Sequence, residues 1–543
     1  MNKLIYSLIL INSLIFPQWL KNEKATKTTA GNLIMENVPS IPIEIKEKSR
    51  RYSNIRSASF RSWIQDGKGM LIATGFGETT QLHKIERPLG QRKQITFYDE
   101  PVGGGYFSSD NSKNGFLFSK DIGGNEYWQV YYYDFDKGKE IMLTDGKTRN
   151  SIGGWSNNGK FFAFSSNKEN GVDMNVFIND LEGNEKQLFS KKGSWSFLDW
   201  SPDDKKVIVR RYISINESYI HVVEINNNKM TRFNDSEEKI SYGNVLYSKD
   251  GKGMYYTSDE GTEFRHLRYY DIRSDKHTIL TKHIDWDVRG FTLSGNGKYI
   301  AFVTNEDAIS KLHVVRTKDF KEIKIPNLPI GQIGSLKFNP DNNRLALTLN
   351  TPRSPGDIFV VDLKKSRLTR WTESEVGGLN NNQFVVPELV HVNSFDGLKV
   401  SGFLYRPKTK GPHPVIISIH GGPEGQYRPG FSSRFQYWIN ELNCAVLATN
   451  VRGSAGFGKS FVKMDNGYNR EKSVKDIGAF LDMIADDNTL DSKRVGVYGG
   501  SYGGYMVLAS MTHFNDRLKA AVDVVGISNF VTFLRNTKAY RRN

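Results

Sequence analysis

A motif that recurs along the first two thirds of the chain constrains its fold more than any other feature. Each copy has an aromatic or apolar anchor, a polar turn, a basic residue and a β-prone run, as in "WSNNGKFFAFSS" and "YSKDGKGMYYTS". A β-rich hairpin follows, which gives about four short strands per unit and the period of a propeller blade. The anchors stand 44, 48, 45, 47, 46 and 45 residues apart, at Trp63, Phe107, Trp155, Trp200, Tyr247, Leu293 and Phe338.

Seven anchors predict a seven-bladed β-propeller over residues 53–375. The near-equal spacings disfavour the alternative, a long array of β-sandwiches. The turns "DGK", "NGK" and "DDK" fit this reading, because Asn, Asp and Gly tolerate the positive φ of tight hairpins. A propeller by itself says nothing about chemistry.

The pattern changes over residues 376–543, where strands and helices alternate. "PVIISI" (414–419) and "CAVLAT" (444–449) are short apolar runs without alternation, as expected for strands buried on both faces of a parallel sheet. A helix is predicted from Val474, because Ile477, Phe480, Leu481 and Ile484 share one helical face. This order predicts an α/β domain with a parallel sheet.

The stretch "VYGGSYGGYM" (497–506) joins a predicted strand to a predicted helix. Gly499, Ser501 and Gly503 fit G-x-S-x-G, in which a serine nucleophile stands on a strained strand-to-helix turn. Side chains two residues to either side would collide with neighbouring elements, and glycine removes the collision. An ordinary glycine-rich turn would show the same five residues, so the strand-to-helix placement and a second motif carry the prediction.

That second motif is "HGGP" (420–423), directly after a predicted strand. An α/β-hydrolase needs one amide from such a loop and the amide after the nucleophile to hold the oxyanion. Gly422 and Tyr502 are the candidates for these two N–H groups. His420 precedes the nucleophile, whereas the base follows it in this fold, so we expect it to shape the loop. "VRGSAGFG" (451–458) is interpreted as a loop beside the active site.

Together, "HGGP", "NVRGSAGFG" and "GGSYGGYM" after a seven-unit propeller resemble the prolyl oligopeptidase family of serine peptidases, most of all its acylaminoacyl-peptidase-like branch. The resemblance extends from about residue 40 to the last residue. It implies hydrolysis of short peptides by Ser501, with a propeller that excludes folded proteins. An esterase on the same scaffold, or a non-catalytic propeller binding module, remains the alternative.

The partners of the predicted nucleophile are missing from the sequence. His513 is the only histidine after Ser501, and it falls within the following helix, while Asp523 falls on the next strand. In the family that the chain resembles, the catalytic Asp and His come after later strands. We therefore expect a C-terminally truncated chain with an incomplete α/β-hydrolase domain that is inactive as written.

Composition adds limits on partners and location. The net charge of +15 is not clustered, so no nucleic-acid partner is expected, and no cofactor or metal is implied. Residues 1–25 contain an apolar stretch that predicts a signal peptide or N-terminal anchor, followed by a lead-in segment over 26–52. Export to the periplasm or outside is expected, or a cytoplasmic location if translation starts later. A homo-oligomer and N-terminal membrane association stay open.

Overall fold

The computed structural model describes residues 26–537, and the predicted signal peptide or anchor over 1–25 lies outside them. The chain divides into two compact units between Arg50 and Arg51. In the first unit, β1 (Lys27–Ala30) pairs antiparallel with β2 (Leu33–Glu36). Helix α1 (Ile43–Ser53) crosses the boundary between the units. No helix of the described residues has the length and apolar character needed to span a membrane.

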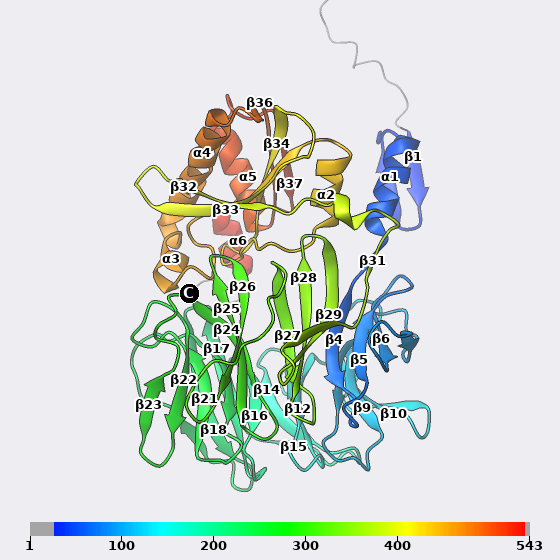
Figure 1. Cartoon of the computed structure of the whole chain (residues 1–543), viewed down its shortest axis with the longest axis vertical. Coiled ribbons are helices and arrows are strands. Elements are labelled where there is room, and N and C mark those ends of the chain that lie inside the picture. Colours follow the sequence, from blue (N-terminus) through cyan, green and yellow to red (C-terminus); the bar gives the residue numbers. More distant parts are fainter. Residues whose placement is uncertain (1–25, 538–543) are drawn as a thin grey trace, which may run out of the picture. The chain divides into compact units, whose positions relative to one another are not determined.

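The repeat forms seven antiparallel blades, which confirms the predicted propeller (Figure 1). The first three blades are β4 (Ala58–Trp63), β5 (Met70–Thr74), β6 (Gln81–Ile85) and β7 (Lys93–Gln94); β8 (Gly103–Phe107), β9 (Gly115–Lys120), β10 (Gln129–Asp134) and β11 (Lys139–Met142); and β12 (Asn150–Trp155), β13 (Phe162–Ser166), β14 (Asn175–Asn179) and β15 (Lys186–Gln187).

The next two blades are β16 (Ser194–Trp200), β17 (Lys206–Ser214), β18 (Glu217–Glu224) and β19 (Met230–Arg232), then β20 (Tyr242–Tyr247), β21 (Gly253–Ser258), β22 (His266–Asp271) and β23 (Lys276–Ile279). The last two are β24 (Asp287–Leu293), β25 (Tyr299–Glu306) and β26 (Ile309–Arg316), then β27 (Gln332–Phe338), β28 (Arg344–Thr351), β29 (Ser354–Asp362) and β30 (Arg367–Arg370).

Every sequence anchor is the last residue of the first strand of its blade, so the seven anchors occupy equivalent positions. These seven first strands contact one another in order, and β27 contacts β4, so they form a closed innermost ring. The expectation of four strands per unit is wrong for the sixth blade, which has three. Its fourth position is reduced to an isolated bridge between Val315 and Glu322, and Pro326, which lacks the N–H that a ladder needs, keeps it from extending past Ile325.

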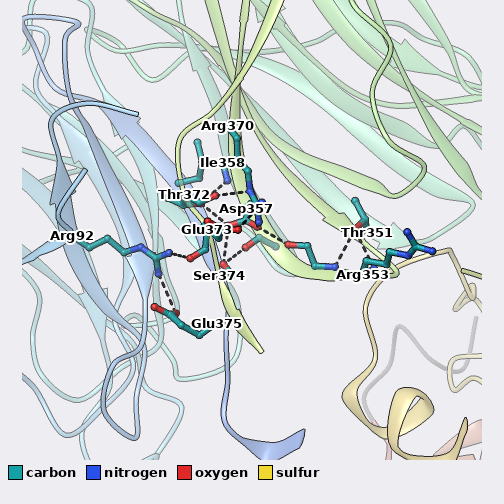
Figure 2. A network of polar contacts seen from close by, with 12 residues as sticks. Arg92, Thr351, Arg353, Asp357, Ile358, Arg370, Thr372, Glu373, Ser374 and Glu375 are labelled. Atoms are coloured by element: carbon teal, nitrogen blue, oxygen red, sulfur yellow. Dashed lines mark hydrogen bonds and ion pairs between the residues drawn. The ribbon is translucent and has the colours of Figure 1, made fainter. Parts of the chain in front are cut away.

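The ring is closed by side chains between the seventh and first blades. The Trp63 and Trp371 rings pack edge to face with centroids 5.9 Å apart. Figure 2 shows the polar network beside this seam, in which Arg92 of the first blade donates to the carbonyl of Glu373. At its centre is the fully buried Asp357, which accepts hydrogen bonds from four side chains, those of Ser354, Arg370, Thr372 and Ser374.

The chain enters and leaves the propeller side by side, because β3 (Ile55–Arg56) pairs antiparallel with β31 (Glu375–Val376). A short 3-10 helix, η2 (Asn381–Gln383), follows. The remaining residues form a six-stranded sheet in the order β32-β33-β35-β34-β36-β37. Its strands are β32 (Glu388–Asn393), β33 (Lys399–Tyr405), β34 (His413–Ile419), β35 (Ala445–Asn450), β36 (Leu490–Gly500) and β37 (Ala520–Val524).

Strands β35, β34, β36 and β37 are parallel, as the alternating pattern predicts, and β32 and β33 form an antiparallel hairpin at one edge. The predicted face of α4 (Arg470–Asp486) packs into the core with strand residues such as Ile417 and Val497. The sequence prediction of an α/β-hydrolase sheet is therefore confirmed. The helices are α2 (Ser433–Asn440), α3 (Lys459–Lys463), α4 (Arg470–Asp486), α5 (Tyr502–His513) and α6 (Phe530–Asn536), with the 3-10 helix η3 (Gly467–Asn469) before α4.

Candidate active site

Ser501 is the single residue between β36 and α5. Its backbone adopts φ 57° and ψ −119°, a conformation that costs free energy for a residue with a side chain. Two hydrogen bonds hold it there: its N–H donates to Val524 O over 3.0 Å, and its carbonyl accepts from Tyr505 N–H over 3.1 Å. The side chain is exposed, so the strained turn presents the hydroxyl to solvent.

The two glycines of the G-x-S-x-G pattern are required by backbone contacts. A Cβ on Gly499 would lie less than 3.0 Å from the carbonyl oxygen of Gly503. A Cβ on Gly503 would lie less than 3.0 Å from the carbonyl oxygen of Ile419, at the end of β34. By contrast, a Cβ on Gly500 would meet nothing closer than Val524 O at 3.5 Å. The helix can thus approach two strands closely only where glycine stands.

The "HGGP" loop lies against the serine. A Cβ on Gly421 would be 3.4 Å from Cβ of Ser501 and 3.0 Å from the carbonyl oxygen of Gly500. Gly422 has φ 138°, and a Cβ there would clash with the amides of Glu424 and Gly425. Within residues 26–537, the Gly422 N–H donates no hydrogen bond.

The other candidate amide belongs to Tyr502, at the first position of α5, where N–H groups have no acceptor within the helix. The Tyr502 side chain is buried, and its hydroxyl donates to Oδ2 of Asp465 over 3.0 Å. Burial raises the pKa of Asp465 to about 6. Sequence reasoning missed Asp465, which stands in "FVKMDNGYN" without any recognisable motif.

His420 connects two loops and does not contact the serine. Its Nε2 lies 2.8 Å from Oγ of Ser454 in the 451–458 loop, and its Nδ1 lies 2.9 Å from the carbonyl oxygen of Gly421. Burial lowers its pKa. In addition, the amide of Ala455 donates to Gly425 O over 3.0 Å. The 451–458 loop therefore adjoins the "HGGP" loop.

An ion-pair network that sequence reasoning also missed anchors the 451–458 loop. The buried Arg452 contacts Oδ1 of Asp476 and Oδ2 of Asp396, each over 2.8 Å. The amide of Arg452 also donates to Asp476 over 2.9 Å. Hydrogen bonding to Arg452 lowers the pKa of Asp396 to about 2. Asp476 comes from α4, so the network attaches the loop to that helix.

No histidine of the described residues contacts Ser501. His513 is exposed at the last turn of α5, where its Nε2 lies 2.9 Å from Glu471 Oε2. Asp523 is on β37, as expected, and a Cβ on Gly504 or Gly526 would clash with its carboxylate. Across residues 26–537, no group of three or more His, Cys, Asp or Glu side chains is arranged to hold a metal ion.

Comparison with known proteins agrees with this architecture. The profile of the prolyl oligopeptidase family matches residues 429–542, and that of the prolyl oligopeptidase N-terminal beta-propeller domain matches residues 99–374. An uncharacterized peptidase, YuxL, of Bacillus subtilis is 26% identical over 74% of this chain and 77% of its own length. Dipeptidyl aminopeptidase BIII of Pseudoxanthomonas mexicana is 24% identical over 78% of this chain and 63% of its own length.

Solved structures share the fold. A puromycin-hydrolyzing peptidase of Mycobacterium tuberculosis superposes with a TM-score of 0.77 at 17% identity, over 92% of this chain and 82% of that one. Prolyl oligopeptidase B of Galerina marginata superposes with a TM-score of 0.78 at 16% identity, over 92% of this chain and 76% of that one. The propeller profile alone covers half of the sequence, and the hydrolase profile follows it in the expected order. The chain belongs to the prolyl oligopeptidase family.

Proposed function

We propose that this chain is a serine peptidase for short peptides, with Ser501 as the nucleophile. The observation that carries the proposal is the strained, exposed turn at Ser501, between two glycines that a methyl group could not replace. Its hydroxyl would attack the scissile carbonyl and form a tetrahedral oxyanion. The amides of Gly422 and Tyr502 would donate to that oxyanion. Within the described residues, neither amide donates a hydrogen bond to another acceptor.

The propeller would limit the substrate to short peptides. Residues at its hydrolase-facing end contact the α/β half directly: Asn305 Nδ2 donates to Gln426 Oε1 over 2.9 Å, and Ser460 N donates to Glu263 Oε1 over 2.7 Å. A propeller in contact with the hydrolase half would admit flexible peptides to the site and exclude folded chains. The dipeptidyl aminopeptidase and prolyl oligopeptidase relatives support a peptide substrate.

Turnover by residues 26–537 would be slow, because a serine hydroxyl is a weak nucleophile unless a base takes its proton. His420 is engaged with the two loops, and His513 pairs with Glu471 at the far end of α5. Neither is placed to accept the Ser501 proton. An acyl-enzyme would also persist, since the same base activates water for deacylation.

Trapping of that acyl-enzyme tests the proposal. The protein is incubated with a peptide p-nitrophenyl ester, digested, and examined by mass spectrometry for an acyl group on the peptide that contains Ser501. We expect the adduct in the natural protein and in the control Ser528→Ala, which removes another exposed serine of the same region. The proposal fails if Ser501→Ala carries the same adduct. A peptide p-nitroanilide with added imidazole, tested in parallel, distinguishes a peptidase from an esterase, because imidazole supplies the base and an esterase would still react with the ester alone.

A further inference from the structure

Four arginine side chains meet where the propeller faces the hydrolase half. They are Arg210, Arg265, Arg289 and Arg428, called the arginine cluster below. Gly243 joins the first two: Nη1 of Arg210 donates to its carbonyl over 3.4 Å, and a Cβ built on it would lie 3.6 Å from Nη1 of Arg265. The guanidinium groups of Arg210 and Arg265 therefore both lie beside Gly243.

The other two arginines continue the cluster. Val288, directly before Arg289, donates its N–H to Arg265 O over 2.7 Å, which brings the two segments together. Arg289 and Arg428 then line the same cavity of about 520 Å³, together with Gln332 and Asn350. Arg428 belongs to the segment between β34 and α2, so the cavity joins the propeller to the hydrolase half.

The cluster is open to the channel of the propeller. Arg289 is an exposed residue on β24, one of the seven first strands that form the innermost ring. On that strand, the neighbouring Asp287 is paired in the ladder with Asn305, the residue that contacts Gln426 of the hydrolase half. An exposed side chain on this part of an innermost strand faces the channel at its hydrolase end.

The positive charges are not neutralised within the described residues. None of the four guanidinium groups forms an ion pair in residues 26–537, and Nε of both Arg210 and Arg265 is buried without a hydrogen-bond partner. Asp287 stands two residues before Arg289 and Glu263 two residues before Arg265. Asp287 already accepts from the backbone N–H of Arg265 at Oδ1, and both carboxylate oxygens of Glu263 accept from Ser460. Partial burial and then repulsion by Arg265 lower the pKa of Arg210.

Arg428 is held in a fixed position. Its Nε donates to Ala308 O over 3.1 Å and its Nη2 to Ser310 Oγ over 2.7 Å. Burial, together with the charge of Arg289, lowers its pKa. Unpaired cations at close range repel one another and destabilise a fold, so a set of them that is held in place favours an anion in the space between them.

We propose that the arginine cluster binds a carboxylate of the peptide substrate, an inference that rests on the proposed function. Guanidinium groups match carboxylates with charge-assisted, often bidentate hydrogen bonds. Arg428 follows Gly422 by only six positions, a span of at most about 22 Å. An extended peptide covers that span with about six residues. The carboxylate would thus lie within about six residues of the bond that Ser501 attacks, which selects short acidic peptides or short peptides with a free C-terminus.

Binding is measured in the Ser501→Ala protein so that hydrolysis plays no part. The probe is a dansylated pentaalanine, prepared as the free acid, as the C-terminal amide, and as an amide with one alanine replaced by glutamate. We expect the acid to bind about ten- to hundredfold more tightly than the alanine amide, from the strength of hydrogen bonds between charged groups. Tight binding of the glutamate amide would assign the site to acidic side chains, and weak binding of it would assign the site to the C-terminus.

The variant Arg289→Met removes one guanidinium that makes no hydrogen bond within residues 26–537, so the fold is expected to survive. In this variant the preference for a carboxylate should fall at least fivefold, with a melting temperature that does not decrease. Arg273→Met is the matched control, because Arg273 is an exposed arginine on the turn between β22 and β23. Equal binding of acid and amide by the parent protein, or an equal loss in both variants, overturns the inference. The proposed function would not be affected by that result, because it requires only that Ser501 attacks a peptide, whether or not the peptide carries a carboxylate.

Discussion

The hydroxyl of Tyr502 donates a 3.0 Å hydrogen bond to the buried carboxyl of Asp465. This bond holds the side chain of the residue whose amide is the proposed oxyanion donor. Asp465 comes from the segment between α3 and α4, so the start of α5 is attached to a second element besides β36. Burial disfavours the charged form of the Asp465 carboxyl and raises its pKa to about 6.

The first prediction concerns stability against pH. A carboxyl whose pKa is higher in the folded than in the unfolded state stabilises the fold when protonated, and this contribution is lost as the pH rises through the folded value. We expect Asp465→Asn, which keeps an acceptor for Tyr502, to gain stability relative to the parent between pH 4 and pH 6, by on the order of 2 kcal/mol. Melting temperatures of both proteins across this range measure the difference. A constant difference at every pH would contradict the prediction.

A second prediction separates the glycines around Ser501. Gly503→Ala should destabilise the protein by a few kcal/mol and remove acylation of Ser501, because the new methyl group would collide with the carbonyl of Ile419. Gly500→Ala is the matched control, since a methyl there meets only ordinary contacts at 3.5 Å or more. Thermal unfolding and mass spectrometry of the acyl adduct report both effects. Equal tolerance of the two substitutions would show that the close approach of α5 to β34 is not what requires glycine.

Much of this architecture follows from local sequence. The anchors end the first strands because an apolar or aromatic residue followed by a tight polar turn has one stable place in a blade. Likewise, the glycines around Ser501 indicate a close backbone contact, although its partner, Ile419, is distant in the sequence. Such patterns can be recognised in the sequence because the residues that form each one are close together in the chain.

The parts that could not be predicted depend on contacts between distant segments. Asp465 meets Tyr502 across 37 residues, and the sequence around it has no periodicity or motif to suggest the contact. The arginine cluster draws Arg210, Arg265 and Arg289 from three different blades, and only the rotation between blades brings them together. The loss of a strand in the sixth blade was visible in principle, because prolines in "IPNLP" interrupt a ladder.

A third prediction concerns closure of the propeller. Asp357→Ala should destabilise the protein by about 3–5 kcal/mol, because it leaves the guanidinium of Arg370 and three hydroxyl groups without their buried acceptor (Figure 2). Glu373→Gln is the control, since this exposed side chain forms a surface pair with Arg370 that is worth less than about 1 kcal/mol. Thermal denaturation compares the two. Similar losses in both would mean that Asp357 does not have a special part in closure.

The last prediction concerns the rate of peptide hydrolysis. Among residues 26–537 no histidine contacts Ser501, so a protein with this sequence alone should cleave peptide p-nitroanilides very slowly. Loss of the base lowers the rate by on the order of 10⁶ in a well-studied serine protease, because oxyanion donors alone cannot remove the proton. Added imidazole should raise the rate, since it supplies a base from solution, and Ser501→Ala should abolish the increase.

His513→Gln completes this test, because it removes the histidine that follows Ser501 while preserving a hydrogen bond to Glu471. We expect its rate with and without imidazole to match that of the parent. A turnover of about 1 s⁻¹ or more without imidazole would be ordinary for an enzyme. If such a rate disappeared in Ser501→Ala, a base would act within this chain; if it also disappeared in His513→Gln, α5 would have to reorganise so that His513 reaches the serine. Slow, imidazole-dependent cleavage by both proteins would instead show that the rate at which Ser501 reacts is limited by the lack of a proton acceptor.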